Sequence, residues 1–227
     1  MSDLPIDLPP ATGSLLAAAF DREGKISRCL ETLGPIADRD VVVIGGGTAE
    51  IARLAEAGVR ATNVKTMPGD DSQALPDGGA DAIVTSWAGF RGVEPAALAE
   101  ADRILRPGGK LLVVHDYGRD DVSRLRGDRP EYGAWSRRNG PFLANGFRMR
   151  VLHCFWTFDT IEVARSFLAE AFGPEGEAVG AGLKRPRLTW NVAVYHRAKD
   201  GAMEPPTGAP AASEVPGAIS AEGRARP

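Results

Sequence analysis

The order of hydrophobic and polar residues divides the chain into short apolar runs and amphipathic stretches. Continuous apolar runs such as "DVVVIG", "ADAIVTSW" and "KLLVVHD" predict buried strands, at residues 40–45, 80–87 and 110–116. "VRATNVKTM" predicts a further strand at 59–67. Apolar residues at helical spacing predict helices that begin near residues 24, 48 and 95. Strands that alternate with helices are typical of a parallel sheet with helices on both faces.

The later part of the chain has a different pattern. "FRMRVLHCFW" at residues 147–156 predicts a long strand of mixed polarity, and a helix is expected at 160–172. "RLTWNVAVYHR" at residues 187–197 alternates with a period of two, as an antiparallel or edge strand does. The sequence therefore predicts parallel strands first and a long antiparallel strand last.

The two ends differ in composition from the middle. Residues 199–227 are rich in Pro, Ala, Gly and Ser and contain almost no large apolar residue, so we expect them to be disordered. Residues 1–13 are expected to behave in the same way. The prediction is one folded domain at residues 14–198.

Composition excludes several classes of partner. The 227 residues are 43% hydrophobic and 25% charged, with a net charge of −3, so no general basic field indicates nucleic acid or an anionic membrane. The two cysteines have no metal-ligand spacing, and no metal site is expected. The chain has no signal-peptide pattern at its start and no apolar run long enough to span a bilayer, which favours a cytoplasmic protein.

A glycine-rich turn is the first candidate for chemistry. In "VVVIGGGTAEIA", residues 41–52, a strand runs into three glycines and then a helix, an arrangement that offers backbone N–H groups to a ligand. The dinucleotide fingerprint needs a glycine where Glu50 stands, whereas the spacing G-x-G-x-G/A is met by Gly45, Gly47 and Ala49. The alternative is a structural turn that holds no ligand.

Two further stretches, read together with this turn, carry a family resemblance. They are "GDDSQALPDGGADAIVTSW", and "ADRILRPGGKLLVV", in which a helix ends in Leu-Arg-Pro-Gly-Gly before a buried strand. In this order the chain resembles the class I S-adenosylmethionine-dependent methyltransferases, in particular the methyltransferase type 11 group, over residues 24–197. The resemblance implies a Rossmann-like, doubly wound, mostly parallel sheet with a C-terminal antiparallel strand.

The chain also departs from this family. Val43 stands where an acidic residue is usual, and the strand that usually ends in a ribose-binding carboxylate ends here in Lys65. Too few residues separate Gly47 from Asp71 for two helices and two strands, so we expect about one strand–helix unit fewer than in the usual seven-stranded core. Strand 59–67 is then either the second or the third strand of the family.

The resemblance implies a set of cofactor-binding residues. Gly45, Gly47 and Ala49 would let the methionine part of S-adenosylmethionine pass the backbone. Asp71 would accept a hydrogen bond from the adenine amino group, with Ser72 beside it; the alternative for Asp71 is a helix cap. Trp87, at the end of a strand, would pack on adenine or cover the substrate, unless it belongs to the core.

Two residues at the end of the strand "KLLVVHD" are the catalytic candidates. His115 can accept a proton near neutral pH, and Asp116 follows it, although an interior histidine with satisfied hydrogen bonds is the alternative. Aromatic and basic residues in "PEYGAWSRRNGPF" lie where such enzymes insert elements that cover the substrate, and they would favour an anionic or aromatic acceptor. The alternative is a packed surface helix. These residues are Tyr132, Trp135, Arg137 and Arg138.

The sequence thus predicts methyl transfer from S-adenosylmethionine to a small-molecule acceptor, without nucleic-acid or membrane partners. It leaves the acceptor and the oligomeric state open. The alternative is a methyltransferase-like protein that has lost the activity and serves as a binding or assembly module, which Val43 and Lys65 favour. A nicotinamide-dependent oxidoreductase is disfavoured by Glu50 and by the missing ribose acid.

Overall fold

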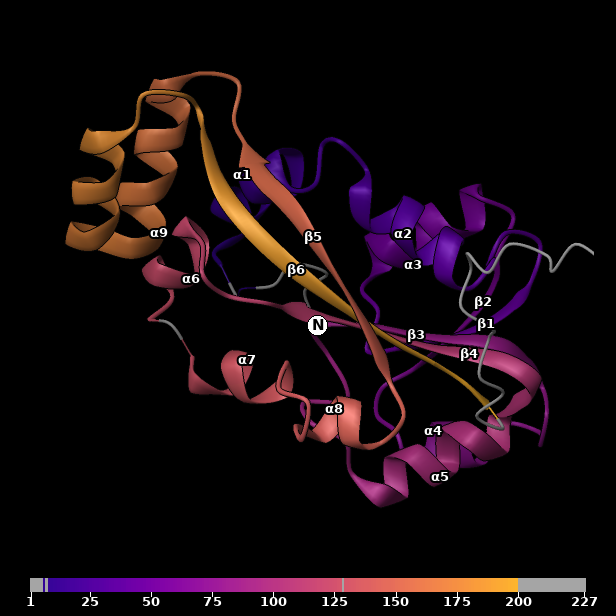
Figure 1. The fold of residues 1–227 in the computed structure, drawn as a ribbon. Helices are drawn as coiled ribbons and strands as arrows, with labels where there is room; N and C mark the ends of the chain where they lie inside the picture. The colour runs from indigo at the N-terminus through magenta and orange to yellow at the C-terminus, as the bar shows by residue number, and fades with distance from the viewer. Residues whose placement is uncertain (1–5, 7, 128, 200–227) are drawn as a thin grey trace, which may run out of the picture.

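The computed structural model describes residues 6, 8–127 and 129–199 (Figure 1). The predicted disordered tail at 199–227 lies outside the described residues, apart from Lys199. The predicted disorder of residues 1–13 does not extend over their last four positions, because helix α1 begins at Pro10. Proline suits the first turn of a helix, and Leu16 and Ala19 anchor α1 in the core.

A single six-stranded sheet organises the chain, with strand order β2-β1-β3-β4-β6-β5. The first four strands in the chain are parallel to one another, whereas β6 is antiparallel to both of its neighbours. The predicted fold class, a mostly parallel doubly wound sheet with a C-terminal antiparallel strand, is confirmed. The strands are β1 (Asp40–Ile44), β2 (Arg60–Val64), β3 (Ala80–Ser86), β4 (Leu105–Asp116), β5 (Arg148–Thr157) and β6 (Arg187–Ala198).

Helices cover both faces of the sheet (Figure 1). On one face lie α1 (Pro10–Ala19), α2 (Lys25–Leu33) and α3 (Thr48–Glu56), and on the other lie α4 (Asp70–Gln73) and α5 (Pro95–Ile104). Beyond β4 the chain forms α6 (Asp121–Leu125), α7 (Pro130–Trp135) and α8 (Pro141–Ala144). Between β5 and β6 it forms α9 (Ile161–Gly182), which folds back on itself at Gly173, where φ is 58°.

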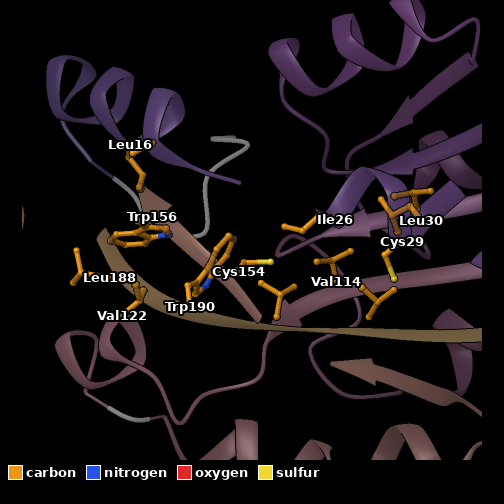
Figure 2. Packing of buried hydrophobic residues seen from close by; sticks show 14 of the residues in the cluster. Leu16, Ile26, Cys29, Leu30, Val114, Val122, Cys154, Trp156, Leu188 and Trp190 are labelled. Carbon is orange, nitrogen blue, oxygen red and sulfur yellow. The ribbon is translucent and has the colours of Figure 1, made fainter. Parts of the chain in front are cut away.

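Each strand divides its side chains between two cores. Val41 and Val43 of β1 face the core under α1–α3, whereas Val42 and Ile44 face the core under α5, α7 and α8. Figure 2 shows the first core, in which two tryptophans of the antiparallel strands, Trp156 and Trp190, lie among aliphatic side chains. Both indoles are fully buried. Strands that are apolar on both faces are what the continuous apolar runs predict.

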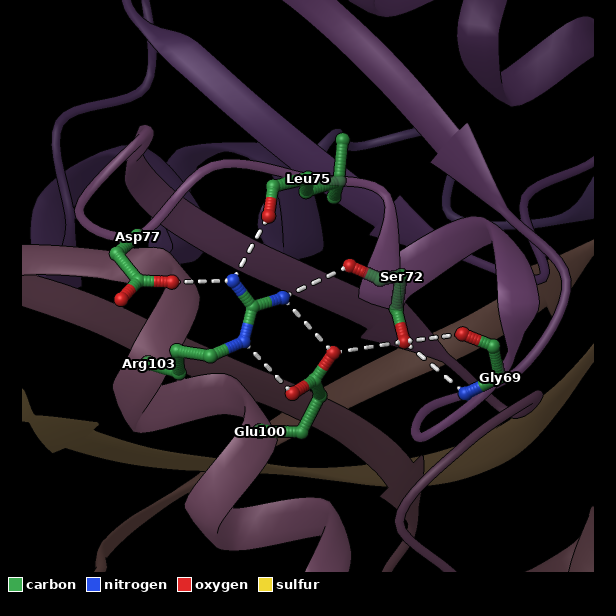
Figure 3. A network of polar contacts seen from close by, with 6 residues as sticks. All are labelled: Gly69, Ser72, Leu75, Asp77, Glu100 and Arg103. Carbon is green, nitrogen blue, oxygen red and sulfur yellow. Dashed lines mark hydrogen bonds and ion pairs between the residues drawn. The ribbon is translucent and has the colours of Figure 1, made fainter.

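The connection from β2 to β3 is short, and an arginine of α5 holds it in place (Figure 3). Arg103 donates to the backbone carbonyls of Leu75 and Ser72, at 2.8 and 3.0 Å, and pairs with Glu100 and Asp77. The buried hydroxyl of Ser72 donates to Glu100. We call these residues the Arg103 network. It stabilises a loop with only one helical turn, α4, where a longer α/β connection would have a full helix.

Strand β2 lies at the edge of the sheet, next to β1. β2 pairs directly with β1 along its whole length, from Asp40↔Arg60 to Ile44↔Val64. In a doubly wound sheet the second strand occupies this place and the third lies outside it. Among the described residues no strand lies outside β2, so β2 has the position of a second strand and forms the edge of the sheet.

Candidate functional site

The glycine-rich turn joins β1 to α3 and has its special conformation at the first glycine. Gly45 has φ of 65° and donates its N–H to the Val64 carbonyl at 2.7 Å. Gly47, with φ of −80°, is the N-cap residue of α3, and Ala49 lies in the first turn of that helix. At Gly46 an added Cβ would lie 2.6 Å from Cγ1 of Val43, so this position has no space for a side chain.

An asparagine of the neighbouring strand binds the middle of this turn. The N–H of Gly46 donates to Oδ1 of Asn63 at 3.1 Å, and Nδ2 of Asn63 donates to the Gly46 carbonyl at 2.9 Å. The strand register places Asn63 opposite Val43, directly before the turn. Both polar groups of Gly46 are therefore satisfied within the protein, while the N-terminus of α3 beyond it retains its partial positive charge.

A cavity lies next to the turn, between the end of β1 and the loops after β2 and β3. Its volume is about 230 Å³, and it is lined by Ile44, Lys65, Thr66, Met67, Ala88, Gly89, Phe90, Arg91, Gly92, Glu94 and Ala97. The chain leaves β1 toward β2 and leaves β3 toward β4, so the crevice between β1 and β3 is the topological switch point. Doubly wound folds bind their ligands in this crevice. Two of the predicted cofactor-binding residues, Asp71 and Ser72, do not line this cavity.

The loop after β3 is strained on the cavity side. Trp87 and Phe90 have φ of 58° and 52°, a region that non-glycine residues adopt only when their surroundings impose it. The hydroxyl of Thr85 accepts the N–H of Gly89 at 2.9 Å and fixes the turn between them. Such local strain is concentrated at binding and catalytic sites.

Trp87 belongs to an aromatic cluster at the carboxyl edge of the sheet. Its ring stacks on Trp190 at 5.5 Å between centroids, and Phe20 packs edge-on against it at 5.6 Å. Its indole Nε1 donates to Asp116 at 3.1 Å. Trp87 is only half-buried, so one part of the ring contacts the core and another remains accessible.

Asp116 accepts hydrogen bonds from four side chains and is buried, at 2% exposure. One carboxylate oxygen accepts from the indoles of Trp87 and Trp190, at 3.1 and 3.0 Å. The other accepts from the Tyr132 hydroxyl at 3.0 Å and forms a buried ion pair with Arg126. We call these five residues the Asp116 network. It joins β4, the loop after β3, β6, α7 and the end of α6.

His115 points to the opposite face of β4 and is held in its neutral form. Nε2 donates to the carbonyl of Phe90 at 2.9 Å, which assigns the proton to that nitrogen because a carbonyl only accepts. Its ring packs against Trp135 and Phe142. Burial lowers the pKa of His115 from 6.5 to about 4. The hydrogen bond anchors Phe90, a residue that lines the cavity.

The remaining candidates are distributed over two regions. Tyr132 and Trp135 are buried at the edge of the second core, whereas Arg137 and Arg138 are exposed beyond α7. Ser72 is buried in the Arg103 network, and the adjacent Asp71 is exposed.

Residues that no sequence pattern indicated complete the site. Asn63, Phe20 and Arg126 come from parts of the chain far from the glycine turn or from β4, and only the strand register and the tertiary packing bring them in. In the part of the chain that the structure describes, no group of three or more His, Cys, Asp and Glu residues is placed to hold a metal ion. Over the same residues, no helix has the length and apolarity needed to cross a membrane.

Comparison with known proteins gives matches among solved structures alone: no family model matches the chain, and no curated protein matches it in sequence. The YcgJ protein from Bacillus subtilis is 15% identical with a TM-score of 0.47, over 78% of this chain and 99% of its own. Two S-adenosylmethionine-dependent methyltransferases, from Geobacter sulfurreducens and Thiobacillus denitrificans, are in complex with S-adenosyl-L-homocysteine. They are 18% and 17% identical with TM-scores of 0.43 and 0.44, over 83% and 84% of this chain and 98% and 99% of theirs.

Proposed function

We propose that the protein is an S-adenosylmethionine-dependent methyltransferase that acts on a small molecule. The observation that carries this proposal is the cavity at the topological switch point, which is lined by the last residue of β1, next to the glycine turn, and by the loops after β2 and β3. A glycine turn, a helix N-terminus and an adjacent cavity at this edge are the parts that a nucleoside cofactor requires.

The cavity suits one part of such a cofactor. At about 230 Å³ it is smaller than the roughly 300–1,000 Å³ of a typical complete ligand pocket and matches a purine ring system. Ile44, Met67 and Phe90 supply apolar contacts for an adenine, and the backbone of residues 88–92 supplies polar groups. The N-terminus of α3, with Gly47 as its N-cap, would face the methionine carboxylate.

The carboxylate that usually ends the second strand of this family is replaced here. Lys65 directly follows β2 and lines the cavity, in which Glu94 is the acid. A carboxylate that accepts hydrogen bonds from ribose hydroxyls contributes about 1.5–3 kcal/mol for each bond. The proposal therefore includes a weak cofactor affinity, roughly ten- to hundredfold below that of a site with the acid.

Catalysis in this proposal depends on alignment. The bound cofactor would supply the methyl group from its sulfonium, and the loop after β3 would orient it toward the acceptor. Correct alignment alone lowers such a barrier by several kcal/mol. His115 and Asp116 are buried and hydrogen-bonded, so we assign them to positioning: His115 holds Phe90, and Asp116 holds the indole of Trp87. Their predicted catalytic roles stay predictions.

A second candidate is a binding module without the methyl-transfer activity. Asn63 satisfies both backbone groups of Gly46, which closes the middle of the glycine turn to a ligand. The stacked Trp87, Trp190 and Phe20 fill part of the space at the carboxyl edge. With the turn closed and this space filled, the site would hold a smaller ligand or no ligand.

Calorimetric titration of the purified full-length chain with S-adenosylhomocysteine, and in parallel with NADH, separates these candidates. The proposal expects weak, saturable binding of S-adenosylhomocysteine and none of NADH. The variant Ala88→Leu, which narrows the cavity, is expected to abolish the binding, while Ala55→Leu on the exposed side of α3 is expected to keep it. No heat of binding in the wild type, or equal binding by the two leucine variants, would support the binding module instead.

A further inference from the structure

A second cavity lies at the other end of the molecule, between the returning segment of α9 and the strands β5 and β6. Its volume is about 460 Å³, twice that of the cavity beside the glycine turn, and the two share no lining residue. Figure 1 shows α9 standing at the end of the β5–β6 pair, next to α6. The lining residues are Asp121, Phe155, Ala178, Val179, Gly182, Leu183, Lys184, Arg185, Arg187, Leu188 and Thr189.

Three exposed cations line this cavity. Lys184, Arg185 and Arg187 come from the segment that joins α9 to β6, and none of them forms an ion pair within 4.0 Å among the described residues. The one acid in the lining, Asp121, is already engaged by Thr189 and Arg124. The three cations outnumber the one acid in the lining, so the cavity has a net positive charge.

The walls of the cavity are apolar and partly aromatic. The guanidinium of Arg187 lies 4.5 Å from the centre of the Phe155 ring, which holds one face of that ring beside a cation. Val179, at 36% exposure, is one of only two large hydrophobic residues that the described part of the chain exposes. Leu183 and Leu188 complete the apolar lining.

From this combination we propose that the cavity binds a small organic anion with an apolar body, such as an aromatic or acyl carboxylate or phosphate. The cations pair with the anionic group, and Phe155, Val179 and Leu183 cover the apolar part. The volume is within the roughly 300–1,000 Å³ of cavities that hold small-molecule ligands. This site is separate from the one beside the glycine turn, and its occupancy does not require S-adenosylmethionine.

The test uses anilinonaphthalene sulfonate, a fluorescent anion with an aromatic body, titrated into the full-length chain. We expect saturable binding to one site that the double variant Lys184→Gln/Arg185→Gln weakens about tenfold, since it removes two ion pairs of modest strength. The double variant Arg39→Gln/Arg53→Gln removes the same charge from exposed positions elsewhere and is expected to bind like the wild type. Equal affinity of the two double variants would overturn the proposal.

Two further arms locate the site. Ala178→Phe fills the cavity without changing its charge and is expected to abolish binding, whereas Ala181→Phe, on the same helix but outside the lining, is expected to retain it. Phenylnaphthylamine, the neutral analogue of the probe, is expected to bind about tenfold more weakly. Saturating S-adenosylhomocysteine leaves the affinity for the probe unchanged if the sites are separate. Displacement of the probe by S-adenosylhomocysteine, or full binding by Ala178→Phe, would contradict the assignment.

Discussion

The Arg103 and Asp116 networks both join an arginine to carboxylates, yet they stabilise different things. Arg103 precedes β4 and pairs with partly exposed acids, and its decisive bonds go to backbone carbonyls of the short β2–β3 connection. Asp116 ends β4, is buried, and accepts only from side chains of other elements. The first network fixes the path of a loop, and the second fixes the positions of aromatic rings at the candidate site. The two networks thus stabilise different parts of the fold, because their charged groups differ in burial and in the groups to which they are hydrogen-bonded.

The largest expected effect is at the buried network. Asp116→Asn removes the carboxylate charge from the buried ion pair with Arg126, at a position that is 2% exposed, and we expect a loss of about 3–5 kcal/mol in the free energy of unfolding. Urea unfolding followed by tryptophan emission measures it. Asp120→Asn is the matched control: this buried carboxylate accepts from two backbone N–H groups and has no arginine partner, so about 1 kcal/mol is expected. Equal losses would remove the distinction between the networks.

His115, the neighbour of Asp116 on β4, makes the same region sensitive to acid. Its pKa is lowered to about 4 by burial, whereas the unfolded chain protonates it near 6.5. The unfolded state therefore binds more protons between these values, and stability is lost as the pH falls from 6.5 toward 4. The expected loss is about 3 kcal/mol.

His115→Gln, whose amide can still donate to Phe90, is expected to flatten this pH dependence. Urea unfolding at several pH values from 7 to 4 provides the comparison, because roughly 1.4 kcal/mol corresponds to one unit of pKa. A slope that is the same in the variant and the wild type would show that His115 does not remain neutral in the folded protein.

A smaller effect is expected at the Arg103 network. Arg103→Gln removes the donors to two loop carbonyls, and we expect a loss of about 2 kcal/mol together with faster amide exchange in residues 65–79. Arg106→Gln removes the ion pairs with Asp40 and Asp81, which involve no carbonyl, and should cost less than about 1 kcal/mol. Hydrogen exchange read by mass spectrometry tests the predicted change in residues 65–79. Faster exchange of Arg103→Gln at the ends of the chain alone would contradict the prediction.

The smallest expected effect concerns affinity. We propose that Lys65, which directly follows β2 and lines the cavity, occupies the ribose position of the proposed cofactor site, and Lys65→Asp is then expected to tighten S-adenosylhomocysteine about tenfold. Asp71 does not line the cavity, so Asp71→Ala is expected to leave the affinity unchanged. Calorimetry compares both with Arg53→Asp, an exposed cation on α3. A tenfold loss in Asp71→Ala would place adenine outside this cavity.

Local sequence was sufficient for the sheet and insufficient for parts of the helical layer. Buried strands such as β1 and β3 are continuous apolar runs, and β6 has a clear period of two, so both types were predicted. The second segment of α9, after Gly173 and Pro174, was not predicted because its glycines and the proline disfavour a helix. Packing against the first segment and α6 stabilises it.

The candidate site was predictable only where it is contiguous in the chain. The glycine turn stands out because three glycines follow a strand. The bond between Asn63 and Gly46 depends on the register of β2 against β1, and the position of Phe20 depends on α1 docking over the sheet. A single sequence does not encode such relations in any local pattern.

The place of β6 in the sheet has a consequence for the order of folding. β6 is the last strand that the structure describes, yet it lies between β4 and β5, and among the described residues it is the only strand that pairs with β5. During synthesis β5 leaves the ribosome before β6 has been made, so β5 has no strand to pair with at that stage. The sheet is therefore completed only when residues 187–198 have been made, and a nascent chain that stalls before them leaves the hydrogen-bonding edge of β4 unpaired.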